Sequence, residues 1–433
     1  MRNVIGFAAC AVVALIPAAV AAQTTGQRIA PPQAVEGWTP TAPQVATSQT
    51  PDPWRQYAPL PPAGLTAGQF KVYPSATAGA FYDDNVFASH SNRQGSWGGL
   101  VRPELGVTTA GQTYALEARG FVEDRWYSRF SSEDQVNGAA GLAGVAMLDK
   151  DTQLVGRARY VHAHEDRGIG ESELFPSFDK PVAYDTFEAA GAINKRFNRW
   201  WTSLGGAVSW QHYQNPTING VPVDQSYRDG YVGVETGRVG YVVAPLTSIF
   251  VEVAGNQRNF QVDAFDSHGW RAVGGVLLEP GPNARVKGEA YAGYMFQDYT
   301  GATFNTVSTF TYGGALAFLL APRWTANVYG SRNALESGLN GGVSLIESTI
   351  AGRIDYMVMP NLFIGAGASY VADQFLGAGR TDSAISPLAS VKYFVNPYVT
   401  LGFDYRNVSF DSTGAGVPTY YRNVYLFSVN ARL

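Results

Sequence analysis

Apolar and polar side chains alternate along most of this chain, from about Phe70 to Leu433, in strand-length segments separated by turn-forming residues. A period of two is the signature of β-strands whose two faces meet different surroundings. Beyond the N-terminal region, no segment approaches the roughly 18 apolar residues of a membrane-spanning helix. A sheet can cross a bilayer only if it closes on itself, because lipid cannot satisfy backbone N–H and C=O groups. The pattern therefore predicts an all-β fold, a transmembrane antiparallel up-and-down β-barrel.

The composition supports a surface that faces something other than water. Charged residues make up 15% of the chain, against about 25% in ordinary soluble domains, and aromatic residues make up 13%. The net charge is −4, so there is no basic footprint for nucleic acid.

The N-terminus predicts export. Residues 1–22 contain an apolar run over 4–20 followed by small residues, which indicates a signal peptide cleaved before Ala22 or Gln23. A transmembrane helix is the competing interpretation, but the run is short and lacks a basic flank after it. The only cysteine, Cys10, lies in this peptide, so we expect no disulfide in the mature chain.

Residues 23–67 differ in composition from the rest of the chain: they are rich in Pro, Thr, Gln and Ala and have no regular period. Such a stretch cannot bury a core, so we expect a disordered N-terminal periplasmic segment. Trp38 and Trp54 could dock it into the barrel as a partial plug; weak interfacial anchoring is the plainer alternative. Residues 68–433 form the predicted outer-membrane β-barrel.

Eighteen strands are expected in this region, with 16 as the alternative count. An even number places both termini on one side of the membrane, here the periplasmic side. The predicted strand cores are 69–82, 97–108, 112–127, 136–148, 152–165, 184–197, 200–213, 227–242, 247–260, 268–279, 284–299, 307–319, 323–334, 346–358, 361–373, 384–395, 398–410 and 420–433.

The connections alternate in length. Every second one is minimal, such as Asn198-Arg199 or Ala321-Pro322, whereas others are long, such as 166–183 and 214–226. Short turns on one rim and long loops on the other are typical of bacterial outer-membrane barrels. Outer-membrane lipid and lipopolysaccharide are therefore the expected surroundings.

The apolar faces carry aromatic residues at the expected membrane boundaries. One face of segment 200–213 begins with Trp200 and ends with Trp210, as in the aromatic girdles of barrels. The last segment has an apolar face that runs to Leu433, similar to the C-terminal strand signal read by the barrel-assembly machinery. A terminal Phe is usual there, so Leu433 is a departure.

The polar faces carry charges of opposite sign two residues apart, as at Arg102 and Glu104. An Arg or Lys facing lipid at the midplane costs about 2 to 4 kcal/mol, so these charges should face water or a polar plug. They either neutralise one another and keep the wall ordered, or create a transverse field that orients solutes. The predicted lumen-lining charges are Arg102, Glu104, Glu117, Arg119, Arg157, Arg159, Glu188, Arg196, Glu235, Glu252, Arg258, Arg271, Arg285, Lys287, Glu289, Arg353, Asp355, Asp404 and Arg406.

Loop 166–183 is the candidate constriction, because it combines acidic and aromatic residues; a solvated surface loop is the alternative. The residues that would narrow the lumen are Glu171, Glu173, Phe175, Phe178 and Asp179.

The sequence gives little indication of a catalytic or metal-binding site. His162 and His164 share a strand face and could ligate a metal, but they fall on the lipid side without a clear carboxylate partner, which favours interfacial histidines. No nucleophile elbow, phosphate loop or zinc-protease motif occurs. We expect no enzyme activity, no catalytic residues, no cofactor and no metal.

A local motif adds a resemblance. The strings Tyr82-Asp83-Asp84-Asn85-Val86-Phe87 and Val101-Arg102-Pro103-Glu104-Leu105 resemble the opening hairpin of the outer-membrane family called putative β-barrel porin 2. The resemblance implies a Gram-negative outer-membrane barrel without established catalytic residues, and some relatives are associated with exopolysaccharide production. From the residues alone, the aspartates form an Asx-type turn at a strand end.

These observations predict a porin-like pore for passive passage of small polar or sugar-like solutes. Two alternatives remain open: an outer-membrane component of exopolysaccharide secretion, with polysaccharide-export proteins as partners, and a closed barrel with a structural or adhesive role.

Overall fold

The computed structural model describes residues 64–168, 178–279, 284–337, 343–414, 417 and 419–433. Within them, one 19-stranded sheet contains the three-residue strand β1 (Leu65–Ala67) and eighteen long strands, which confirms the predicted count of 18. The long strands are β2 (Phe70–Asp83), β3 (Ser96–Ala110), β4 (Tyr114–Tyr127), β5 (Gln135–Met147), β6 (Thr152–His164), β7 (Ala183–Phe197), β8 (Trp200–Tyr213), β11 (Gly230–Ala244), β12 (Thr247–Phe260), β13 (Ser267–Leu278), β14 (Val286–Tyr299), β15 (Val307–Ala321), β16 (Trp324–Ser337), β17 (Val343–Met359), β18 (Leu362–Phe375), β19 (Arg380–Phe394), β20 (Val399–Ser412) and β21 (Tyr420–Arg432).

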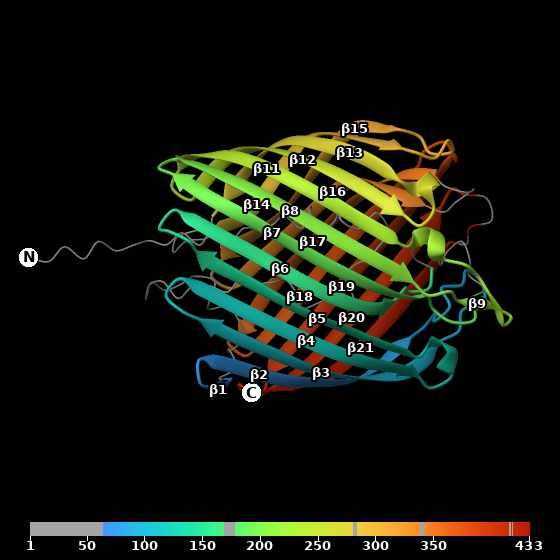
Figure 1. Ribbon diagram of the computed structural model, residues 1–433. Helices are drawn as coiled ribbons and strands as arrows, with labels where there is room; N and C mark the ends of the chain where they lie inside the picture. Colours follow the sequence, from blue (N-terminus) through green and yellow to red (C-terminus); the bar gives the residue numbers. More distant parts are fainter. Residues whose placement is uncertain (1–63, 169–177, 280–283, 338–342, 415–416, 418) are drawn as a thin grey trace, which may run out of the picture.

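The sheet closes into a barrel because the first and last long strands pair with each other. β2 and β21 run antiparallel, from Ser75 opposite Arg432 to Asp83 opposite Val424. Every other long strand pairs with its neighbours in sequence, and the strands cross the barrel obliquely (Figure 1). Closure leaves no free sheet edge, whose backbone N–H and C=O groups would have no hydrogen-bond partners in lipid.

The two rims differ as predicted. Short turns and the C-terminus lie on one rim, at the left in Figure 1, and the longer connections lie on the other. In the short turn between β7 and β8, Asn198 adopts a left-handed φ of 58°, which asparagine tolerates better than most residues. The long-connection rim carries the small hairpin of β9 (Thr217–Ile218) and β10 (Val221–Pro222).

Several predicted boundaries need correction. Ser226–Arg228 forms a 3-10 turn, so β11 begins at Gly230 rather than at 227. The connection between the predicted strand cores 323–334 and 346–358 is shorter than expected, because β16 extends to Ser337 and β17 begins at Val343. The last residues of the predicted segment 23–67 form β1, which pairs with the start of β2; the predicted signal peptide and residues 23–63 lie outside the described residues.

The apolar core consists of separate clusters on the inner wall. The largest packs Phe121, from the middle of β4, together with Val161, Tyr184 and Tyr213, near the long-connection ends of β6, β7 and β8, against Phe178 from the loop after β6. Side chains and loops therefore occupy part of the barrel mouth at that rim. None of the helices in the described residues is long and apolar enough to cross a membrane.

Candidate functional site

The strand alternation separates an outer from an inner wall. On β8, Trp200 and Trp210 are 54% and 46% exposed, whereas Trp201 and Ser209 are 8% and 1% exposed. The buried side chains face the inside of the barrel. They include ion-pair partners on strands that are not neighbours, such as β11 and β14, and such side chains can meet only across the barrel interior. The two exposed tryptophans lie ten residues apart on a tilted strand, which matches an apolar band of about 25 Å.

Ion pairs within single strands line the inner wall. At least three of the five predicted opposite-sign pairs are ion pairs in the structure, and the side chains of these three are between 14% and 33% exposed. The N–O distances are 3.7 Å for Arg102 and Glu104, 2.9 Å for Arg119 and Glu117, and 2.8 Å for Arg353 and Asp355.

Two inward charges on β4 were missed from the sequence. Glu123 lies 3.9 Å from Arg102 on β3 and 3.5 Å from Arg125, two residues further along β4. The signal was present, since both positions continue the period-two series that includes Arg119. The charged wall on β3 and β4 is therefore longer than predicted.

A second, fully buried charge cluster joins β11, β12, β13 and β14. Arg238 bonds Glu252 through Nε and lies 2.9 Å from Glu289 Oε2 through Nη1, and Arg271 Nη2 donates to Glu252 at 2.5 Å. Arg271 also donates to the Tyr291 hydroxyl at 3.2 Å. Because all of these groups are buried, this side of the lumen is filled by its own side chains.

The prediction for Glu235 is wrong. It shares the outward face of β11 with Tyr231 and Val239, which are 47% and 49% exposed, while Arg238 is inward. Apolar residues occupy both faces of β11, so the alternation alone did not show which face is inward and which is outward. The hairpin register could have done so, because it places Arg238 directly opposite Glu252.

Arg285 is the other predicted lumen charge that lies elsewhere: it is exposed at the short-turn rim, just before β14. The remaining predicted charges have inward positions. Arg196 lies 2.7 Å from Glu279, and Arg258 lies 2.5 Å from Glu336 on β16. The others are Arg157, Arg159, Glu188, Lys287, Asp404 and Arg406.

Part of the predicted constriction loop can be placed. Phe178 is 4% exposed and packs on the inner wall, while Asp179 is exposed and accepts hydrogen bonds from Thr217 Oγ1 at 2.6 Å and Gly220 N at 2.9 Å. These bonds, that of Thr217 above all, hold the pKa of Asp179 below its usual range. Glu171, Glu173 and Phe175 lie outside the described residues.

Sequence reasoning missed buried ion pairs in this mouth region. Arg167 lies 2.7 Å from Glu133, and Arg228 bonds Glu165. Each pair joins connecting segments that are far apart in sequence, so no local spacing indicates it. They tie the outer connections to one another inside the mouth.

The two predicted interfacial histidines point outward near the long-connection rim. The sequence indicated no clear carboxylate partner, but His162 Nδ1 lies 2.8 Å from Asp185 Oδ1 on β7, and His164 Nδ1 lies 2.9 Å from Asn137 Oδ1. Among the residues with described positions, no group of three or more His, Cys, Asp or Glu side chains could hold a metal ion.

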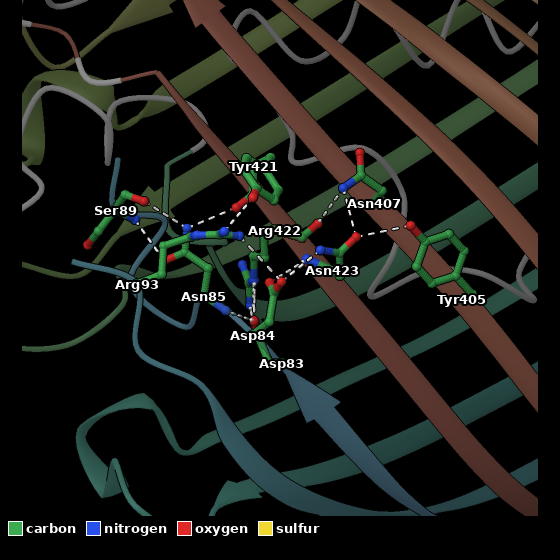
Figure 2. Close-up of polar contacts among 10 residues, drawn as sticks. All are labelled: Asp83, Asp84, Asn85, Ser89, Arg93, Tyr405, Asn407, Tyr421, Arg422 and Asn423. Atoms are coloured by element: carbon green, nitrogen blue, oxygen red, sulfur yellow. Dashed lines mark hydrogen bonds and ion pairs between the residues drawn. The ribbon is translucent and has the colours of Figure 1, made fainter. Parts of the chain in front are cut away.

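The aspartates of the opening hairpin lie at the barrel seam (Figure 2). Asp83 accepts the Asn85 N–H at 3.0 Å, as in the predicted Asx-type turn, and also accepts three hydrogen bonds from Arg422 on β21 at 2.5 to 3.1 Å. Asp84 accepts from both the backbone N and Nδ2 of Asn423 at 2.7 Å. The motif therefore fastens the first strand to the last.

Comparisons with known proteins agree with this fold. The family model described as Putative beta-barrel porin 2 matches residues 58–433. No curated protein sequence matches the chain. Similar solved structures include three from Pseudomonas aeruginosa: OpdK with vanillate (TM-score 0.44, 14% identity, 84% of this chain and 98% of that chain), OpdQ (0.44, 12%, 85% and 99%) and OpdL (0.40, 12%, 85% and 99%). Because the family match extends over the whole barrel, the chain belongs to the family Putative beta-barrel porin 2.

Proposed function

We propose that this protein is a passive outer-membrane pore for small polar or sugar-like solutes, with both termini in the periplasm. Membership of a β-barrel porin family supports a channel role that needs neither catalysis nor a cofactor. Eighteen strands are enough to enclose an aqueous channel unless loops or side chains fill it.

The observation that carries the proposal is the partly exposed charged wall inside the barrel. The ion pairs of Arg119 with Glu117 and Arg353 with Asp355 lie on β4 and β17, on different sides of the barrel, and keep 14% to 33% of their side-chain surface exposed. Charged groups of both signs need water beside them, and they favour polar solutes without a strong overall preference for one ion.

Conductance of the refolded protein in planar bilayers tests the proposal. We expect stable current steps from the mature chain and from a matched variant lacking residues 23–63, a deletion that keeps β1 paired with β2. Heat-modifiable migration on gels would establish that both have folded. Steps seen only after the deletion would support a plug, and the absence of steps from both folded proteins would refute the pore.

A closed barrel with a structural or adhesive role is the second candidate. It is favoured by the buried charge cluster around Arg238 and by the apolar packing of Phe178 within the mouth, since both fill interior space. Folded protein without conductance in either form would support this role.

A further inference from the structure

The long-connection ends of β15 and β16 do not pair with each other. Their register ends at Gly313 opposite Ser331, although both strands continue beyond these residues. β15 stays paired with β14 as far as Val307, and β16 stays paired with β17 as far as Ser337. The two strands therefore separate at this point, and residues 307–312 of β15 have no ladder partner among the described residues of β16.

Beyond this point the end of β16 lies inside the barrel. Val328, which is 46% exposed, marks the outward face of β16, and the period of two continues that face to Ala334 and Glu336. These two residues are only 3% and 4% exposed. Ala334 packs in a cluster with the inward Met295 of β14, and Glu336 contacts the inward Arg258 of β12. Outward-face side chains can reach the inner wall of other strands only if the strand end bends into the lumen.

The opposite face of this strand end is covered as well. Leu335 on β16 forms a buried cluster with Val343 and Leu345 on β17 and with Phe375 on β18. We call residues 332–337 of β16 and 343–348 of β17, which pair with each other, the mouth hairpin. Because both of its faces are buried, the mouth hairpin occupies interior space at the long-connection rim.

One buried ion pair fastens the mouth hairpin to the inner wall. Arg258 Nη1 donates to Glu336 Oε1 at 2.5 Å, and Ser267 Oγ donates to the same oxygen at 3.3 Å. Within the described part of the chain, Arg258 Nε and Glu336 Oε2 are buried without a hydrogen-bond partner. A buried pair with unsatisfied atoms recovers only part of its desolvation cost, and water would satisfy both atoms if the hairpin left. Apolar packing therefore favours the docked position, and the incompletely bonded ion pair opposes it.

The barrel wall offers the mouth hairpin a second position. Continuing the register of β15 and β16 beyond Gly313 and Ser331 would place Phe310 opposite Ala334 and Val307 opposite Ser337. Each of residues 307–312 would then gain a partner on β16. Glu336 would face outward at the rim, two residues beyond Ala334, where water is within reach.

Side chains already bridge the point at which the strands separate. Thr311 Oγ1 donates to Arg332 O at 2.7 Å, and Arg332 Nε donates to Phe310 O at 3.2 Å. These contacts hold β16 beside β15 at Arg332. A movement of the mouth hairpin would therefore pivot at this residue.

We propose that the mouth hairpin is a gate with two positions. Docked on the inner wall it narrows the mouth of the pore, and paired with β15 it completes the wall and opens the mouth. The inference rests on the proposed pore function and adds its regulation. Packed elements with two discrete arrangements respond to small changes in balance, and here the pair of Arg258 with Glu336 sets that balance.

Single-channel recording of the full mature protein tests the gate through two variants with opposite effects. We expect two current levels in the wild type. Glu336→Gln leaves the buried Arg258 charge uncompensated, so the time ratio of the high to the low level should rise more than about tenfold. The double variant Arg258→Met with Glu336→Met replaces the pair by apolar side chains and should lower this ratio. Asp411→Asn, which changes an exposed carboxylate near the same rim on β20, should alter the ratio less than about twofold.

Thiol reactivity gives a readout that needs no current. The only cysteine, Cys10, lies in the predicted signal peptide, so Ala334→Cys supplies a single thiol in the mature chain. A charged methanethiosulfonate should modify it slowly in the docked position. Adding Glu336→Gln should raise the rate more than about tenfold, and adding the two methionine substitutions should lower it.

A disulfide identifies the second position. Phe310→Cys with Ala334→Cys would place two thiols directly opposite each other only if the register of β15 and β16 continues. Cross-strand pairs have Cα atoms about 4.5 to 5.5 Å apart, which suits a disulfide. We expect this disulfide to form faster when Glu336→Gln is also present.

Failure of the gate and failure of the pore give different results. Equal thiol rates in the wild-type, Glu336→Gln and double methionine backgrounds, or no disulfide in the Glu336→Gln background, would overturn the gate. If the folded wild type does not conduct, the pore is refuted, while the thiol rates still decide whether the hairpin moves. If heat-modifiable migration shows that Glu336→Gln does not fold, Glu336→Asp keeps the charge but shortens its reach to Arg258. That variant should raise the thiol rate severalfold, and an unchanged rate would count against the proposal.

Discussion

Loss of the Asp83 carboxylate should open the barrel at its seam. Asp83 is 0% exposed and accepts three hydrogen bonds from Arg422, which is 8% exposed (Figure 2). Removing one partner of a buried pair leaves an uncompensated charge and costs about 3 to 5 kcal/mol. Asp166 also acts on the charge of Arg422, so we expect Asp83→Ala to lower the free energy of unfolding by about 3 kcal/mol, the low end of that range.

Urea unfolding in lipid vesicles, followed by tryptophan fluorescence, would measure this loss. Asp355→Ala is the matched control, because its pair with Arg353 is about one third exposed and should contribute only about 0 to 1 kcal/mol. In the double variant Asp83→Ala with Arg422→Met, neither buried charge remains, so we expect much of the stability to return. About 1 kcal/mol should stay lost, because Asp83 also accepts the Asn85 N–H.

Two results would refute the reasoning. One is a decrease in the free energy of unfolding of Asp83→Ala that is no larger than the decrease in Asp355→Ala. The other is a double variant whose cost equals the sum of the two single losses, since the buried pair would then have no coupling.

Three further predictions concern the outer wall and the mouth. Glu235→Leu should raise the free energy of unfolding in the same assay by up to about 2 kcal/mol, because a carboxylate leaves the lipid-facing wall; a loss of stability would contradict its outward position. Phe178→Ala should lower it by about 3 kcal/mol through a cavity on the inner wall, and an unchanged value would contradict the packing described. The pKa of Asp179 is lowered by its hydrogen bonds, so its contribution is present above the ordinary value of about 4 and lost as the pH falls through the lowered value. The protection factors against hydrogen exchange in the hairpin 217–222, which are corrected for the intrinsic pH dependence of exchange, should therefore fall at acid pH, and this fall should be absent in Asp179→Asn.

Ion pairs on a single strand could be predicted from the sequence, but pairs between distant strands could not. Arg119 and Glu117 share a face because of the period of two, and no tertiary information is needed. Arg238 and Glu289 meet only because the barrel curves, and Arg422 and Asp83 meet only because it closes. The error at Glu235 has a related cause, since lipid and interior packing both accept apolar residues and β11 has them on both faces.

By itself, the sequence determined the strand count, the strand order, the two unequal rims and most of the lumen-facing charges. All of these follow from the alternation of neighbouring residues and the length of the turns, which are local properties. The tertiary structure alone decided which interior charges are buried, how the seam is fastened and which side chains occupy the mouth. Those features depend on contacts between residues that are distant in the chain, and only the closed barrel brings them together.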